Sequence, residues 1–319
     1  KYNIEIEKTE QSEKEKEKIN QKESLYIVNK FAQEQFSKDL WELPEGVAIG
    51  LSYFRERGFS DETIRFFGLG YAANQIDYFF KNSTKAGYLE KNIYDTGLVI
   101  KNERGKVDRF RGRVMFPIRS MAGRVQGFGG RILSSTSKIA KYLNSPESDI
   151  YHKSQILYGI FEAKKAIAKE DICYLVEGYT DVIQMYQSGV ENIVSSSGTA
   201  LTPEQIRLIR RLTSNIVVLF DGDAAGLNAA IRGIDLILEQ GMNVRICSFP
   251  EGEDPDSFAK SHSLEEIKVY LSEQAKDFIQ FKTDLLLEKA ENDPIKKAST
   301  VREIVQSISS STVSYTHLR

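Results

Sequence analysis

The chain has 319 residues, a formal net charge of −2, 41% hydrophobic residues and 28% charged residues. This length allows about two domains, and the hydrophobic fraction excludes a wholly disordered or fibrous protein. The sequence has no run of eighteen apolar residues and no signal peptide, so we expect a cytoplasmic protein without a membrane span. Two cysteines 74 residues apart exclude a cysteine-based zinc site and argue against a disulfide framework. With three histidines in the chain, we expect a reduced, cytosolic location.

The first half of the chain begins with a charged segment and continues as a mixture of helices and strands. Residues 1–24 are mostly Glu, Lys and Gln, which predicts a solvated linker. Because the chain begins with Lys1, we expect it to be a piece of a longer protein. The expected elements are helices at 25–41, after Ser60 and within 75–96, and strands at 98–100, 114–118 and 125–128. These elements predict an α+β subdomain over 25–165.

From Asp171 onward, short apolar runs alternate with segments of helical pattern. The expected strands are 172–176, 192–195, 216–220 and 244–249, and the expected helices are 181–187, a segment opened by Thr202, and 225–239. Such alternation is typical of a parallel sheet with helices on its faces, here over 166–262. Residues 263–310 are expected to form a helical bundle, and 311–319 a tail.

Acidic residues follow three of the predicted strands. Glu177 comes directly after 172–176, and the pairs Asp221/Asp223 and Asp254/Asp256 follow 216–220 and 244–249. With Asp181 they make six carboxylates. The carboxyl ends of parallel strands form one ligand-binding edge, where clustered negative charge favours Mg²⁺ with oxygen ligands. This pattern predicts Mg²⁺-dependent phosphoryl chemistry, and the alternative for each group alone is helix capping or a solvated loop.

A strongly basic stretch lies earlier in the chain. Residues 101–131 contain nine Lys or Arg and two acids, a net charge of +7. Arg109, Arg111 and Arg113 alternate, so we expect them to share one face of a strand or ribbon, where guanidinium groups suit phosphate oxygens. Lys141 and Lys153 offer further donors. The clustering predicts a polyanionic partner, and the alternative is a solvated sheet face that pairs with the acidic rim.

The residues around both clusters resemble one known family. Glu177-Gly178-Tyr179-Thr180-Asp181-Val182, Asp221-Gly222-Asp223-Ala224-Ala225-Gly226 and Gly252-Glu253-Asp254-Pro255-Asp256 resemble the TOPRIM motifs of bacterial DnaG-type primases. The segments 109–118, 127–131, 141–147 and 157–159 are similar to the same family. The resemblance covers about residues 25–305.

This resemblance implies a DNA primase, a DNA-directed RNA polymerase and nucleotidyltransferase that makes short RNA primers from NTPs on single-stranded DNA for DNA replication. It implies α/β and α+β folds: an N-terminal basic subdomain (25–165), a TOPRIM subdomain (166–262) and a helical bundle (263–310). It implies that Glu177, Asp221 and Asp223 are catalytic metal-site acids, that Asp181, Asp254 and Asp256 support them, and that two or more Mg²⁺ or Mn²⁺ ions bind there. It assigns template and nucleotide binding to Arg109, Arg111, Arg113, Arg131, Lys141, Asn144 and Lys153.

The resemblance also sets expectations about partners. The family's zinc-binding and helicase-interaction domains have no counterpart in this sequence, so we expect no zinc here and contact with the replicative helicase through a region outside it. We expect a monomer that works at the replication fork in the nucleoid. Two alternatives remain open, a TOPRIM-type nuclease and a non-catalytic module that binds single-stranded DNA. Extension that requires NTPs would separate polymerisation from both.

Overall fold

The computed structural model describes residues 13–103, 105–133, 140–198, 200–220, 233–278 and 280–281. By their contacts, the described residues form two compact units. Unit 1 comprises those up to Gly50 together with Gly70–Pro117 and Arg124–Tyr151, and unit 2 comprises Leu51–Leu69, Ile118–Gly123 and those from His152 onward. This division is discontinuous in sequence, because two short segments from the first half of the chain belong to unit 2. The linear subdomain boundaries given above stay predictions.

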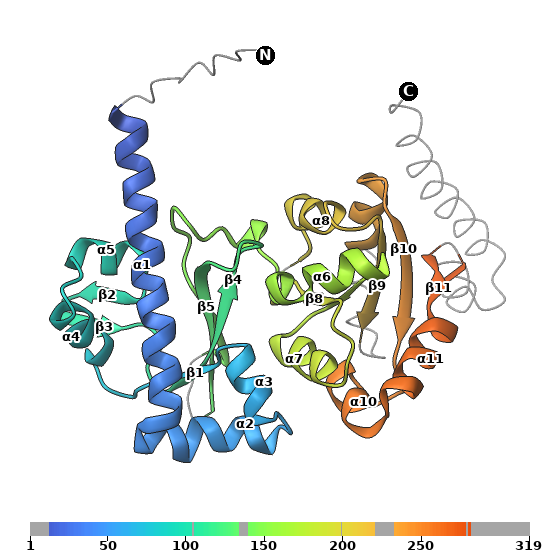
Figure 1. Ribbon diagram of the computed structural model, residues 1–319, viewed down its shortest axis with the longest axis horizontal. Helices are drawn as coiled ribbons and strands as arrows, with labels where there is room; N and C mark the ends of the chain where they lie inside the picture. The colour runs from blue at the N-terminus through green and yellow to red at the C-terminus, as the bar shows by residue number, and fades with distance from the viewer. Residues whose placement is uncertain are drawn as a thin grey trace, which may run out of the picture. The chain divides into compact units, whose positions relative to one another are not determined.

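Unit 1 is an α+β unit built on a small sheet. Its helices are α1 (Glu13–Glu42), η1 (Gly46–Leu51, a π-helix), α4 (Tyr78–Lys85) and α5 (Glu90–Asp95). Its strands are β1 (Gly70–Ala72), β2 (Val99–Asn102), β3 (Gly105–Asp108), β4 (Arg113–Arg119, whose last two residues belong to unit 2), β5 (Val125–Ile132) and β6 (Tyr142–Asn144). The sheet has the order β1-β4-β5-β6, and β2 and β3 form a separate hairpin. Figure 1 shows α1 between the sheet and the α4–α5 region.

Helix α1 forms the spine of unit 1 because its apolar residues recur at helical spacing. Val28, Phe36 and Leu40 are buried, and the Phe36 ring packs edge-on against Phe128 of β5 with centroids 5.4 Å apart. The helix approaches β1 so closely that a Cβ atom on Gly70 would lie 2.6 Å from the Phe36 side chain. The predicted helix and the three predicted strands are confirmed.

The helix begins at Glu13, inside the segment predicted as a linker. Arg124 accounts for part of this difference, because its guanidinium pairs with the Glu23 carboxylate at 2.6 and 2.7 Å and lies 3.7 Å from the centre of the Tyr26 ring. The charged segment therefore has tertiary contacts that its composition does not reveal.

Unit 2 contains the parallel sheet. Its helices are α2 (Ser52–Glu56), α3 (Asp61–Phe66), η2 (Lys153–Gln155, 3-10), α6 (Ile160–Glu170), α7 (Tyr179–Gln187), α8 (Pro203–Arg210), α10 (Pro255–Ser261) and α11 (Leu264–Gln274), and residues 233–239 are also helical. Its strands are β7 (Cys173–Val176), β8 (Ile193–Ser195), β9 (Asn215–Phe220), β10 (Asn243–Ser248) and β11 (Lys276–Asp277). The strand order is β11-β10-β9-β7-β8.

The predicted parallel sheet is confirmed. Strands β8, β7, β9 and β10 pair in parallel, and β11 adds an antiparallel edge strand that the sequence did not predict. Apolar side chains of α6, α8 and 233–239 share one core with the strands. Of the predicted bundle, the structure describes α11, and residues 282–310 lie outside the described residues. No helix in the part of the chain that the structure describes has the length and hydropathy of a membrane span.

Candidate functional site

The carboxyl edge of the parallel sheet carries the predicted acidic site. The register pairs Leu175 of β7 with Val218 of β9, and Val218 with Ile246 of β10, so these three strands end at the same edge. Glu177 follows β7 at this edge, and its side chain is exposed. Asp221 and Asp223 follow β9 and lie outside the described residues.

A serine loop after β8 holds the backbone at Glu177. The Glu177 carbonyl accepts hydrogen bonds from the Ser195 hydroxyl (3.0 Å) and the Gly198 amide (3.2 Å). The Ser195 Oγ atom also accepts from the Ser197 amide at 2.9 Å, and Ser197 has a positive φ of 61°, uncommon for a residue with a side chain. A cavity of about 310 Å³ opens beside this loop, lined by Glu177, Ser196, Gly198, Ala200, Leu201 and Phe220 among others.

Sequence reasoning missed this loop as part of the site. The signal that could have found it is the run Ser195-Ser196-Ser197-Gly198 directly after a predicted strand, because small polar residues and glycine at the carboxyl edge of a parallel sheet are typical of ligand-binding loops.

Asp181 lies in the first turn of α7, and its carboxylate turns back toward the end of β7. Its Oδ2 atom accepts the Gly178 amide at 3.0 Å, and a Cβ atom on Gly178 would lie 2.9 Å from that oxygen. The glycine in the Glu177-Gly178 motif thus leaves room for a carboxylate close to the main chain. This contact holds the Asp181 carboxylate at the amide of the residue after Glu177, and it stabilises the start of the helix.

The third acidic group begins α10. Asp254 caps the helix, because its Oδ1 atom accepts the Ser257 amide at 2.7 Å. Asp256 is only 5% exposed, and its Oδ2 atom accepts from Arg57 at 2.7 Å and from Lys260 at 2.9 Å. Its Oδ1 atom is buried without a hydrogen-bond donor among the described residues. Helix capping, the alternative raised for each acidic group, therefore accounts for one contact of Asp254. The charge of Asp256 is balanced by the side chains of Arg57 and Lys260.

The donor chemistry of this edge fits a hard divalent cation. Every predicted ligand that the structure describes offers carboxylate oxygen, and Asp256 keeps one buried oxygen atom for a further partner. Among the described residues, which exclude Asp221 and Asp223, no three His, Cys, Asp or Glu side chains are grouped to hold a metal ion.

The three alternating arginines of unit 1 do not share a strand face. Arg109 and Arg111 lie in a turn between β3 and β4, and only Arg113 is in a strand, as the first residue of β4. The prediction of a common face was therefore wrong. The turn forms because Gly112, with φ of 64°, donates its amide to the Ala72 carbonyl at 2.8 Å.

These arginines differ in their surroundings. Arg111 is exposed, Arg109 is partly buried with one guanidinium nitrogen 3.4 Å from the Asn144 carbonyl, and Arg113 is only 3% exposed. Burial lowers the pKa of both Arg109 and Arg113 below the usual arginine value, and repulsion by Arg109 lowers that of Arg113 further. Neither guanidinium forms an ion pair with any residue that the structure describes.

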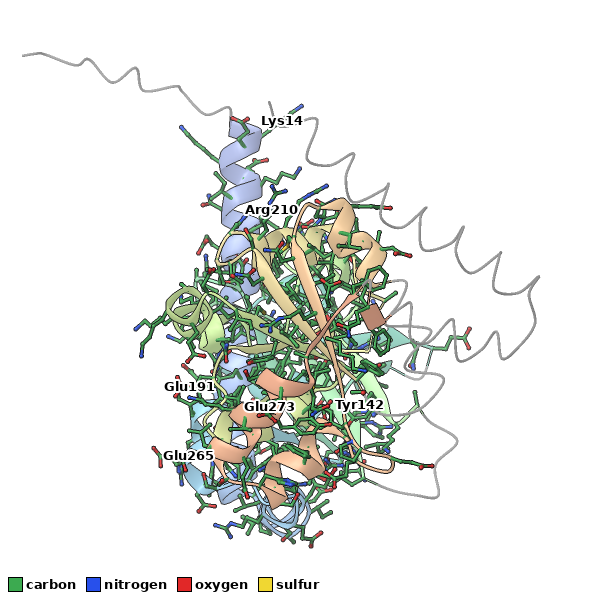
Figure 2. All side chains as sticks on the ribbon, turned by 90° about the vertical axis from the view of Figure 1, so that its right-hand side faces the viewer. Lys14, Tyr142, Glu191, Arg210, Glu265 and Glu273 are labelled. Carbon is green, nitrogen blue, oxygen red and sulfur yellow. The ribbon has the colours of Figure 1, made fainter. Side chains whose placement is uncertain are left out.

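The edge of the unit 1 sheet gathers four more residues with candidate roles. Strand β6 pairs with β5 through Gly129↔Asn144, Gly130↔Leu143 and Arg131↔Tyr142. Tyr142, labelled in Figure 2, is 39% exposed, and its hydroxyl accepts from Arg131 at 3.2 Å. Lys141 is exposed just before β6, and Asn144 ends it. The structure thus brings Arg109, Arg113, Arg131, Lys141 and Asn144 into one region of unit 1.

Lys153 belongs to η2 of unit 2, where its carbonyl accepts from the Gln205 side chain at 3.2 Å. That contact fixes η2 beside the first turn of α8.

The chain is similar to DNA primases and to Toprim-like proteins. A family model described as the N-terminal domain of the DNA primase catalytic core matches residues 36–164, and a Toprim-like model matches 174–259. A crystal structure of a DNA primase domain from Pseudomonas aeruginosa is 35% identical, with a TM-score of 0.81 over 90% of each chain. A DnaG primase catalytic domain bound to single-stranded DNA is 34% identical, with a TM-score of 0.80 over 92% of this chain and 94% of that one.

The chain therefore belongs to the DnaG primase family, as the motifs indicated. The curated DNA primase of Clostridium acetobutylicum is 36% identical over 300 residues, which are 92% of this chain and 48% of that protein. The chain thus spans about half the length of the curated relatives it matches. Toprim domains and primases generally use divalent metal ions.

Proposed function

We propose that this chain is the catalytic core of a primase, which joins NTPs into short RNA primers on a single-stranded DNA template for DNA replication. The observation that carries the proposal is the match to a DNA primase domain at 35% identity over 90% of each chain. The acidic motif at the end of β7 and the basic residues of unit 1 supply the two chemistries that such a reaction needs. It works at the replication fork in the nucleoid.

Glu177, Asp221 and Asp223 hold the divalent ions in this proposal, and Asp181, Asp254 and Asp256 support them. The ions are Mg²⁺ or Mn²⁺, two or more in number, and they supply Lewis-acid stabilisation of the reacting phosphate when bound. The protein's part is positioning: the serine loop fixes the backbone at Glu177, while Arg57 and Lys260 fix the Asp256 carboxylate. Glu177 is exposed, so it is available as a ligand or as a proton acceptor.

The basic residues of unit 1 bind the template and the nucleotide in this proposal. Arg109 and Arg111 offer guanidinium groups from the turn before β4, while Arg131, Lys141 and Asn144 lie at or next to β5 and β6. Lys153 contributes from η2. Arg109 supports this role because it is partly buried without a carboxylate among the described residues, and a phosphate group would compensate that charge.

The wider partners follow from the family. In this proposal the chain binds NTPs and the growing RNA primer, works as a monomer, and reaches the replicative helicase through a region outside this sequence. These assignments rest on family membership alone.

The test is primer synthesis on a labelled single-stranded template with NTPs and Mg²⁺. The wild-type chain should yield short RNA, and Asp221→Ala should abolish synthesis while template affinity stays within about twofold, because the basic residues of unit 1 are unchanged. Incubation with Mn²⁺ but without NTPs is the second arm. Cleavage of the DNA in that arm would indicate a nuclease, and full synthesis by Asp221→Ala would refute the site assignment.

A further inference from the structure

Arg113 differs from the other basic residues of unit 1 in what it touches. Its guanidinium donates to three backbone carbonyls, those of Ala140 (3.0 Å), Lys141 (3.1 Å) and Gly130 (3.3 Å). We propose that Arg113 is a positioning residue: it does not bind nucleic acid itself but holds the backbone before β6 so that Lys141 and Tyr142 face the template. This inference rests on the proposed function and deepens it.

Burial and donor geometry separate Arg113 from a direct phosphate contact. A guanidinium has five N–H groups in a planar fork, and here three of them are directed at main-chain oxygens. Only 3% of the Arg113 surface is exposed. A side chain that binds the DNA backbone must be accessible to the phosphate groups, and Arg113 is not. A lysine could not replace it, because a compact ammonium group cannot span carbonyls on two segments in the same way.

The segment that Arg113 holds needs support from outside its own strand. Strand β6 has three residues and lies at the edge of the sheet, where β5 is its one neighbouring strand among the described residues. The Lys141 carbonyl, just before the strand, accepts from both the Ile132 amide (2.9 Å) and Arg113. Glycine at 130 makes the approach possible, because a Cβ atom there would lie 2.7 Å from the Phe110 ring and 3.1 Å from the Arg113 side chain.

Exposed side chains lie at and next to the start of β6. Lys141 and Tyr142 are exposed, and Arg131 of β5 lies across from Tyr142, with its guanidinium 5.5 Å from the centre of the ring. The arrangement has two layers, a buried arginine that fixes the main chain and an outer layer that meets the ligand. Loss of Arg113 should then weaken template binding only by displacing Lys141, Tyr142 and Arg131. It should have no effect of its own once those contacts are removed.

Salt dependence of template binding tests this order of action. Affinity for single-stranded DNA falls as salt rises, and each lost phosphate contact makes the slope of log affinity against log salt about 0.7 less steep, which we call a lower slope. We expect Arg113→Met to lower the slope in the wild-type chain, but to leave it unchanged in a background that carries Lys141→Ala and Arg131→Ala. Arg113→Lys should behave like Arg113→Met. The matched control is Arg124→Met, which removes an arginine of the same unit outside this region and should leave the slope as in the wild type.

Amide hydrogen exchange in the DNA-free protein gives a readout that does not depend on the proposed function. Exchange at Leu143 and Ser145, whose amides face β5, should be faster in Arg113→Met than in the wild type and unchanged in Arg124→Met. Absence of template binding by the wild type would refute the proposed function and not this exchange result. A further slope decrease of about 0.7 in the Lys141/Arg131 background, rescue by Arg113→Lys, or unchanged exchange at Leu143 and Ser145 would each overturn the inference.

Discussion

Replacement of Arg57 by alanine tests whether the contact at the start of α10 stabilises unit 2. Asp256 is 5% exposed, and Arg57 and Lys260 donate to the same carboxylate oxygen at 2.7 and 2.9 Å. Breaking a buried ion pair costs about 3–5 kcal/mol, because the remaining charge has lost its partner. Here Lys260 stays in place and the Arg57 side chain is 28% exposed, so we expect Arg57→Ala to lower the free energy of unfolding of unit 2 by about 1–3 kcal/mol.

The assay has to report on unit 2 specifically. The one tryptophan of the chain, Trp41, belongs to unit 1, so hydrogen exchange at the amides of α10 during urea titration is the better probe. Arg55→Ala is the matched control two residues earlier, because its pair with Asp61 is exposed and should contribute little. If Arg57→Ala lowers the free energy of unfolding no more than Arg55→Ala does, Arg57 does not stabilise Asp256 and the reasoning is refuted.

Two further predictions concern unit 1, where Trp41 fluorescence reports unfolding. Gly70→Ala should destabilise the unit by about 1–3 kcal/mol, because its Cβ atom would lie 2.6 Å from Phe36, and unchanged stability in urea would contradict the close packing of α1 on β1. Burial raises the pKa of Asp39 to about 6, above the value near 4 of an unfolded chain, so its contribution to stability should fall as pH rises from about 4 to 6. Asp39→Asn should flatten that part of the stability–pH curve by about 1–2 kcal/mol, and an unaltered curve would show that Asp39 is ionised in the fold.

The sequence predicted best those features that local chemistry determines. Ser60 and Thr202 stand at the helix starts where their hydroxyls accept the amides of Thr63 (3.1 Å) and Gln205 (3.2 Å), and both starts were expected from residue type. The continuous apolar runs that became β7 and β9 indicated burial on both faces, and the structure confirms the parallel sheet. Strand β10 differs, because Asn243, Arg245 and Ser248 are exposed.

The features that were missed depend on contacts between distant residues. Arg57 meets Asp256 across 199 positions, and no local pattern indicates that pairing. The alternation of Arg109, Arg111 and Arg113 predicted a strand, but the Gly112 amide bonds to the Ala72 carbonyl and closes a turn instead. The resemblance assigned Arg113 to template and nucleotide binding, and that assignment stays a prediction. Its contacts with three main-chain carbonyls could not be read from the sequence, because only the folded chain brings those carbonyls together.

The discontinuity of the two units has a practical consequence for anyone who divides this protein. The backbone passes from one unit to the other five times, at 50/51, 69/70, 117/118, 123/124 and 151/152. A truncated piece that starts at residue 166 would lack α3, so Tyr186 would lose the Phe66 ring stacked on it at 5.1 Å. Unit 2 is therefore unsuited to expression as one truncated chain. Its transfer into another protein requires the segments 51–69 and 118–123 as well as the residues from 152 onward.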